Sequence, residues 1–212
     1  MTDVRVTGLF PVPLMIVSEA LPQRLVDGLL ADFAAAPTAT NSQSNQLSHT
    51  NVVEADATDN FRQVAVTATP HVVEFGKLLF GEALEWIIKE MWMNRLESGG
   101  QQSVHSHANS FISGVVYLNE TDPSTRTVFY RGMGGRDFVL ANEHPGTKTG
   151  PYNAQKWAVP QPAPGDMVLF PSYMLHEVPQ NAGDTRFSLA FNVVPTRLRS
   201  YDYELRLSSE RA

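Results

Sequence analysis

A succession of short strand-like segments fills the second half of the chain and restricts the folds that it can adopt. The segments are apolar, or alternate between apolar and polar residues, and turns with glycine or proline separate them. They predict strands at about 103–107, 112–118, 125–131, 156–159, 167–170, 176–178 and 186–194. Many short strands in succession are typical of a sandwich or barrel, in which each strand buries one face. We therefore predict a barrel of the jelly-roll type.

The first half of the chain instead predicts two helices. Apolar residues recur at helical spacing in 21–36 and again in 64–80, where Pro70 falls in the first turn and Gly81 ends the pattern. The remaining segments predict an edge strand at 9–17, a polar loop at 38–60 that could reach the mouth of a site, a strand at 83–95 that ends at Asn94, and a turn at 97–102. Helices that precede strands make the fold class α+β.

Length and composition indicate a single domain. The 212 residues suffice for one sizeable core, so we expect one domain over 1–212, with helical support over about 18–82 and the jelly-roll core over about 83–195. Hydrophobic residues make up 42% of the chain, an ordinary share for a globular protein. A long glycine-rich segment between Gly132 and Asn153 predicts a lid between two barrel strands.

Charge and cysteine content exclude several kinds of partner and site. The net charge is −6 and no block of lysine or arginine occurs, so a nucleic-acid partner is not expected; the C-terminal arginines alternate with acids, which predicts a solvated tail. The absence of cysteine excludes disulfides, thiolate metal sites and a cysteine nucleophile, and fits a reducing cytoplasm. The N-terminal residues resemble neither a signal peptide nor a membrane span, so we expect a cytoplasmic protein without a membrane partner. No pattern predicts an oligomeric state.

Two close histidines and one remote histidine are the candidate metal ligands. His105 and His107 lie two residues apart in a predicted strand, so their side chains share one face. Such a pair alone is more often a half-exposed polar pair. His176, which follows an apolar strand and a turn, adds a third imidazole. Three nitrogen ligands from one face would leave coordination positions open, which indicates a reactive metal centre.

Arg186 lies in the apolar segment TRFSLAFNVV, where a charged side chain is costly to bury without an anion. Its guanidinium group suits a carboxylate, and the hydroxyl of Ser188 on the same strand face can add a hydrogen bond. The alternative is a structural salt bridge to an acid such as Asp166 or Asp184. The pair Arg186 and Ser188 therefore predicts an anion-binding site.

Three stretches of sequence carry a resemblance to a known family. They are WMN at 92–94, HSHANSFISGVVYLN at 105–119, and PGDMVLFPSYMLHEV at 164–178 with RFSLAFN at 186–192 after it. A histidine pair, a distant histidine and then Arg-x-Ser resemble the iron(II)- and 2-oxoglutarate-dependent oxygenases. The sequence around these residues is similar to that of a small bacterial and phage branch of that superfamily, over about residues 90–195.

The resemblance implies a double-stranded β-helix, a cupin-like jelly roll, with Fe(II) and 2-oxoglutarate as cofactors. It assigns His105, His107 and His176 to the metal, and Arg186 and Ser188 to the far carboxylate of 2-oxoglutarate. Two further residues, Tyr117 and Asn94, would line the cosubstrate pocket, although a tyrosine on an apolar strand is as often a packed aromatic with a satisfied hydroxyl. The implied reaction hydroxylates a small-molecule or peptide substrate, whose identity stays open, and releases succinate and CO2.

His107 departs from the pattern of most superfamily members, which have Asp or Glu at this position. Three outcomes stay open: a three-histidine iron site, a two-histidine site with an acid such as Asp137 or Glu143, or a different metal. We do not predict a halogenase, because His107 would fill the halide position. Two other functions also stay open, namely a three-histidine cupin-type dioxygenase without 2-oxoglutarate and a non-catalytic barrel that binds a metal or ligand.

Overall fold

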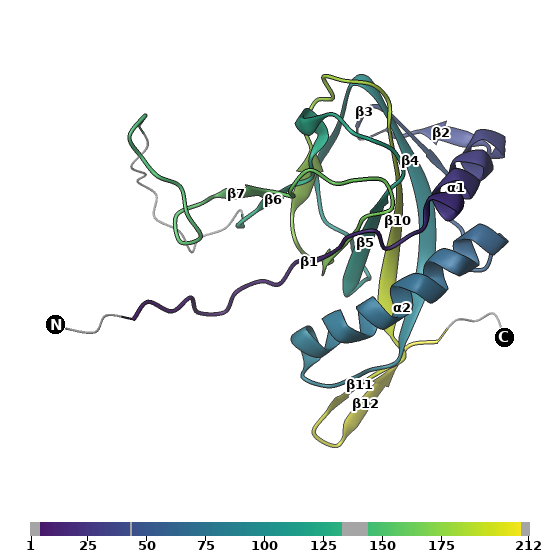
Figure 1. Ribbon diagram of the computed structural model, residues 1–212. Helices are drawn as coiled ribbons and strands as arrows, with labels where there is room; N and C mark the ends of the chain where they lie inside the picture. Colours follow the sequence, from purple (N-terminus) through teal and green to yellow (C-terminus); the bar gives the residue numbers. More distant parts are fainter. Residues whose placement is uncertain (1–4, 43, 133–143, 209–212) are drawn as a thin grey trace.

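The computed structural model describes residues 5–42, 44–132 and 144–208, and in it two helices lie against a curled antiparallel sheet (Figure 1). The helices are α1 (Gln23–Ala35) and α2 (Asp59–Phe80), with a short 3-10 helix at Pro123–Thr125. The strands are β1 (Met15–Val17), β2 (Thr38–Thr40), β3 (Asn45–Thr50), β4 (Trp86–His105), β5 (Ile112–Tyr117), β6 (Val128–Tyr130), β7 (Lys156–Ala158), β8 (Met167–Pro171), β9 (His176–Val178), β10 (Arg186–Pro195), β11 (Arg197–Ser200) and β12 (Tyr203–Arg206). This arrangement confirms the predicted α+β class.

The long strand β4 joins the two layers of the jelly roll. The strand order is β1-β8-β5-β10-β4-β9-β6-β7, with β3 also on β4 and β2 on β3. The first part of β4 pairs with β10 from Trp86 to Leu96, whereas its last part pairs with β9, where His105 lies opposite His176. Because β4 passes from one layer into the other, its end lies in the second layer beside β9. The double-stranded β-helix that the resemblance implied is therefore confirmed.

Alternation along β10 separates the apolar core from the barrel interior. Phe187, Leu189, Phe191 and Val193 pack against residues of both helices in the main core. The intervening side chains, Arg186, Ser188, Ala190 and Asn192, point to the other face, because side chains alternate along a strand. The helices therefore cover the outer face of the sheet and leave the polar positions of β10 to the interior.

The helix α2 begins earlier than its apolar stripe predicts. Thr58 caps it by accepting a hydrogen bond from the backbone N–H of Phe61, and Asp59 follows in the first turn. Pro70 consequently lies inside the helix, on an exposed face, and the prediction that placed it in the first turn is wrong. The prediction of the end is confirmed, since Gly81 has a φ of 78° and forms a left-handed cap.

Three predictions in the first half of the chain need correction. The strand predicted at 9–17 is reduced to β1, because its prolines cannot join a ladder. The polar segment at 38–60 is not one loop, since it forms β2 and β3. The predicted turn at 97–102 is part of β4: Gly99, with φ 79°, forms an irregularity within the strand, while β3 and β9 continue the pairing on either side.

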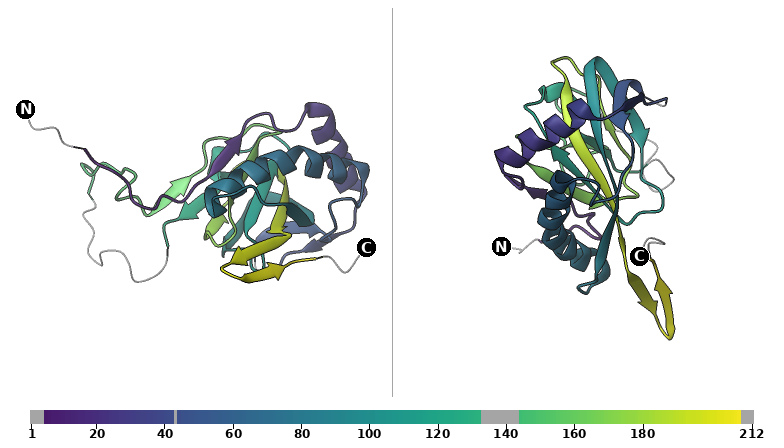
Figure 2. Two further views of the ribbon diagram at one scale, coloured as in Figure 1. Left: turned by 90° about the horizontal axis from the view of Figure 1, so that it is seen from below. Right: turned by 90° about the vertical axis from the view of Figure 1, so that its right-hand side faces the viewer.

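The strand predicted at 103–107 is the end of β4, which stops at His105, so His107 lies just after the strand. The strands predicted from 112 onward agree to within about two residues, except that 125–131 contains the end of the 3-10 helix and the shorter β6. The predicted solvated tail is an exposed hairpin of β11 and β12, which projects from the body of the molecule (Figure 2). Half of the predicted lid at 132–153, residues 133–143, lies outside the described residues. No helix in the described part of the chain is long and apolar enough to cross a membrane.

Candidate metal centre and cosubstrate pocket

Three histidines meet where β4 leaves the main layer. His105 ends β4, His107 follows it, and His176 begins β9. One ring nitrogen from each lies within 4.8 Å of the others, and the Nε2 atoms of His105 and His107 are 3.4 Å apart. His176 is 4% exposed and the other two are half-buried. The structure thus brings together the three predicted ligands, in a cluster that contains no carboxylate from the described residues.

The outer nitrogens of two rings are held by the backbone. His105 Nδ1 lies 2.8 Å from the carbonyl of Ser103, and His176 Nδ1 lies 2.9 Å from the carbonyl of Met174. A carbonyl oxygen only accepts, so each Nδ1 carries the proton and each Nε2 keeps its lone pair. Both Nε2 atoms are therefore unprotonated, and that of His105 lies 3.3 Å from the amide nitrogen of Gln102.

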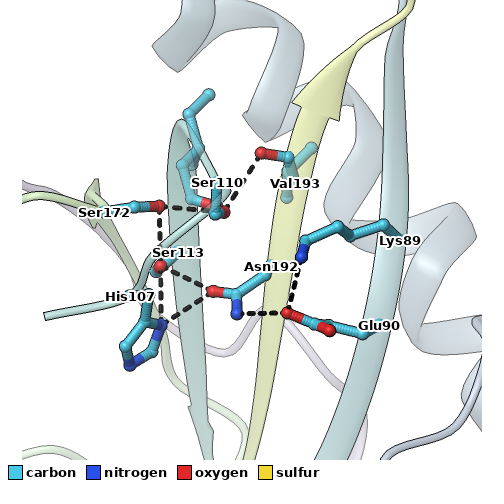
Figure 3. Close-up of polar contacts among 9 residues, drawn as sticks. Lys89, Glu90, His107, Ser110, Ser113, Ser172, Asn192 and Val193 are labelled. Carbon is cyan, nitrogen blue, oxygen red and sulfur yellow. Dashed lines mark hydrogen bonds and ion pairs between the residues drawn. The ribbon is translucent and has the colours of Figure 1, made fainter. Parts of the chain in front are cut away.

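The outer nitrogen of His107 has side-chain partners instead. Its Nδ1 lies 2.7 Å from Asn192 Oδ1 and 2.8 Å from Ser113 Oγ (Figure 3). The amide nitrogen of Asn192 donates to Glu90 Oε1 at 2.7 Å, which fixes the amide oxygen toward the histidine. All three rings thus present Nε2 to one point, an arrangement that suits a transition metal.

Burial keeps the three imidazoles neutral. It lowers the pKa of all three rings, and for His176, where nearby His105 adds to the effect of burial, the pKa falls to about 3. At neutral pH the cluster therefore needs to release no proton before it binds a cation.

Arg186 is buried in the barrel interior, and no acid among the described residues pairs with it. Its Nη1 donates to Ser188 Oγ at 3.0 Å, its guanidinium group lies 5.2 Å from the ring centre of Tyr117, and its Nε has no hydrogen-bond partner in the described part of the chain. Burial lowers its pKa from the ordinary value of arginine. Within the described ranges no carboxylate forms an ion pair with it, and the side chain of Asp166 accepts from backbone N–H groups instead. A buried cation of this kind is costly unless an anion joins it.

A row of polar side chains crosses the sheet beside Arg186. His49 on β3, Asn94 on β4, Ser188 on β10 and Tyr117 on β5 lie directly opposite one another in register. Directly paired residues share a face, so these side chains line one strip of the interior. The Tyr117 hydroxyl lies 3.1 Å from Thr127 Oγ1 and is satisfied within the protein. The row brings the predicted pocket residues together, while their roles toward a ligand stay predictions.

Sequence reasoning missed three residues near these groups. Gln102 Nε2 lies 3.3 Å from the metal-facing Nε2 of His105, and its position in a presumed turn concealed it. His49 was concealed by the loop prediction for 38–60. Asn192 lies within the quoted RFSLAFN, yet nothing local distinguishes it from a solvent-facing polar residue. The alternative acids Asp137 and Glu143 lie outside the described residues.

Comparisons with known proteins find similar solved structures and one family model. Comparison with curated proteins finds no match. Among solved structures, HygX from Streptomyces hygroscopicus, with nickel and 2-oxoglutarate bound, is 13% identical with a TM-score of 0.64, and the match covers 87% of this chain and 84% of HygX. A prolyl-4-hydroxylase from Pseudomonas putida is 18% identical with a TM-score of 0.59, over 86% of this chain and 92% of that chain.

A third similar structure is SnoN, a non-heme alpha ketoglutarate dependent epimerase from nogalamycin biosynthesis; it is 16% identical, with a TM-score of 0.62 over 91% of this chain and 83% of SnoN. At these identities the likeness establishes the fold. The family model of the 2OG-Fe(II) oxygenases matches residues 90–192, which include the three clustered histidines, Arg186 and Ser188. Over these residues the chain is similar to the 2OG-Fe(II) oxygenases.

Proposed function

We propose that this protein is an Fe(II)- and 2-oxoglutarate-dependent hydroxylase. It would couple the conversion of 2-oxoglutarate to succinate and CO2 with the hydroxylation of a C–H bond in a small-molecule or peptide substrate. The observation that carries the proposal is Arg186, a wholly buried cation without a carboxylate partner among the described residues, in the barrel that also holds the three histidines.

The residues present fit both cofactors. Three neutral imidazoles with their Nε2 lone pairs directed to one point suit Fe(II), among other transition metals, and leave room for exchangeable ligands. The far carboxylate of 2-oxoglutarate would supply the anion for Arg186 and accept a further hydrogen bond from Ser188. Bound Fe(II) and 2-oxoglutarate would supply the oxidising chemistry, which no side chain of the protein can provide.

The inward side chains near the two groups are small or apolar. On β10 the inward residue between Ser188 and Asn192 is Ala190, which is buried. Phe129 and Phe170 form an apolar wall, with ring centres 5.6 Å and 4.8 Å from that of His176. These side chains would exclude water from the reacting atoms, while Arg186 and Ser188 orient the cosubstrate.

An anaerobic titration with Fe(II) and then 2-oxoglutarate tests the proposal. Binding of a 2-oxo acid to iron produces a visible charge-transfer band, which we expect in the parent protein. In Arg186→Met iron binding should persist, whereas the affinity for 2-oxoglutarate should fall at least about tenfold, because a buried charged hydrogen-bonded pair is lost. Arg95→Met is the matched control, since Arg95 is half exposed and pairs with Glu97 on the same strand.

Each contrary result has its own meaning. Unchanged affinity for 2-oxoglutarate in Arg186→Met would show that the anchor is elsewhere. Iron binding without the band in the parent protein would contradict the use of 2-oxoglutarate and would favour a dioxygenase that binds its substrate directly. Failure to bind iron at all would contradict the metal centre.

A further inference from the structure

The three histidines differ in what holds their outer nitrogens. His105 and His176 are held by backbone carbonyls, which are neutral. His107 alone is linked to a charged group, because Asn192 connects it to the carboxylate of Glu90 (Figure 3). Glu90 in turn lies 3.0 Å from the ammonium group of Lys89. We call this chain of contacts from Glu90 through Asn192 to His107 the relay.

The carboxylate fixes the direction of every hydrogen bond in the relay. Ionised Glu90 only accepts, so the amide nitrogen of Asn192 must face it and the amide oxygen must face His107. That oxygen also only accepts, so His107 Nδ1 must donate and therefore carries the proton. His107 Nε2 is then left with a lone pair toward the cluster. One carboxylate thus determines the tautomer of a histidine that it does not touch.

The fold builds the relay from three neighbouring strands. Glu90 on β4, Asn192 on β10 and Ser113 on β5 lie directly opposite one another in register, so their side chains share the interior face. Ser113 Oγ hydrogen bonds Asn192 Oδ1 at 2.7 Å and Ser172 Oγ at 2.8 Å. Asn192, Ser113 and Ser172 are at most 4% exposed, so water has little access to compete for these contacts.

The charge state of Glu90 supports this reading. Burial raises the pKa of its carboxyl group, but hydrogen bonds from Asn192 and Lys89 outweigh that effect and bring the pKa below its ordinary value. The ionised carboxylate strengthens the hydrogen bond that it receives, and Asn192 passes this polarisation on to His107.

We propose that Asn192 and Glu90 are positioning residues that hold His107 in its Nδ1–H tautomer, make its Nε2 a stronger donor, and thereby set the affinity of the metal centre. The proposal rests on the proposed function, because it requires His107 to bind the metal. The histidine cluster contains no carboxylate from the described residues, and in this proposal the carboxylate of Glu90 supplies the negative charge through the relay.

The tautomer is measured first, in the metal-free protein, from the ring 15N chemical shifts of His107. The parent should show the Nδ1–H form, and Asn192→Leu, which removes the acceptor, should show a mixture or the Nε2–H form. Asn192→Asp keeps an acceptor oxygen toward His107 but loses the N–H donor to Glu90, and it should keep the parent tautomer, which shows that the acceptor at His107 Nδ1 sets the tautomer. A parent tautomer in Asn192→Leu would overturn the proposal.

Metal affinity is measured second, by titration with Ni(II) alone. We expect Glu90→Gln to weaken binding about tenfold and Asn192→Leu by more, up to about a hundredfold, as is typical when an outer partner of a ligand is removed. Glu97→Gln is the matched control, because Glu97 lies on the same strand and bonds Thr185 and Arg95, with no contact to the histidines. It should stay within about twofold of the parent protein.

Double mutants with His107→Ala distinguish an effect of the relay on Ni(II) affinity from an error in the three-histidine site. In a His107→Ala background Glu90→Gln should have no further effect on Ni(II) affinity, whereas an effect on folding alone would persist there. If His107→Ala itself leaves affinity unchanged, the three-histidine site is wrong. If His107→Ala weakens binding but neither Glu90→Gln nor Asn192→Leu does, the site stands and the relay is wrong. Should Asn192→Leu fail to fold, the half-exposed Glu90 still provides the test.

Discussion

At the scale of single residues, the burial of His176 in the histidine cluster makes the stability of the protein depend on pH. Its pKa of about 3 results first from burial and then from nearby His105. The unfolded chain binds a proton with the ordinary pKa of 6.5, whereas the folded chain does not until the pH approaches 3. Between these values the unfolded state binds more protons. The stability of the metal-free protein is therefore complete above 6.5 and falls as the pH drops toward 3.

We expect the metal-free protein to lose about 2 kcal/mol of unfolding free energy between pH 7 and pH 5 through this group. His176→Leu should remove this share of the pH dependence, and His144→Leu, at an exposed histidine, should leave it unchanged. Urea unfolding at the two pH values measures the difference. An equal pH dependence in the parent and in His176→Leu would show that His176 is charged in the folded state.

How much of the site the sequence reveals depends on whether its residues are neighbours along one strand. The pair Arg186 with Ser188 follows from period-two spacing within β10, and His105 and His107 are close because they lie two residues apart where β4 ends. By contrast, Glu90 and Asn192 meet only through the register of two strands that are remote in sequence, and no local pattern encodes a register. The direct contacts of the centre are thus predictable, and the residues that support them are not.

At the scale of elements, β5 and β10 approach each other closely at one point. Gly114 lies directly opposite Phe191, and a Cβ atom on Gly114 would overlap the buried ring of Phe191. That ring packs in the main core against the helices and has no room to withdraw. The glycine therefore allows β5, which carries Ser113 and Tyr117, to lie against β10 in the observed register.

We predict that Gly114→Ala lowers the unfolding free energy by about 1–3 kcal/mol, because the added methyl group overpacks the core. Gly150→Ala is the control, since its nearest neighbour lies 3.9 Å from the added Cβ. Phe191→Leu in the Gly114→Ala background should recover part of the loss, as the smaller side chain makes room. Denaturant unfolding of the four proteins measures this. Equal stability of Gly114→Ala and the parent would contradict the packing argument.

The elements that sequence patterns predict least well are those whose ends depend on distant partners. The start of α2 is set by Thr58, a capping signal outside the apolar stripe. The prediction of a turn at 97–102 is wrong because Gly99 and Gly100 are compatible both with a chain reversal and with an irregular strand. Only the pairing of β4 with β3 and β9 selects the strand. The strands from β5 to β10 were predictable because they are short, largely apolar segments between turns, and β5, β8 and β10 are buried on both faces.

At the scale of the whole molecule, the candidate site spans both layers of the jelly roll. The histidines come from the end of β4, the residues after it and β9, whereas Arg186 and Ser188 come from β10 in the main layer. The helices and the main core lie on the opposite face of that layer. The order of helices and strands along the chain predicts that the helices cover one face of the sheet, because the apolar faces of helices and sheet pack together. A bound metal and cosubstrate would connect the two layers, so their binding should stabilise the entire fold.

Thermal unfolding tests this connection. A ligand at about a hundred times its dissociation constant stabilises the folded state by about 2.7 kcal/mol, which corresponds to roughly 5–10 °C for a chain of this size. We expect Ni(II) to raise the Tm, 2-oxoglutarate to raise it further only when Ni(II) is present, and Arg186→Met to keep the first increase and lose the second. His176→Ala should lose both, because without the metal the cosubstrate is held at one end only. An increase with 2-oxoglutarate alone that equals the increase with Ni(II) present would contradict joint binding across the two layers.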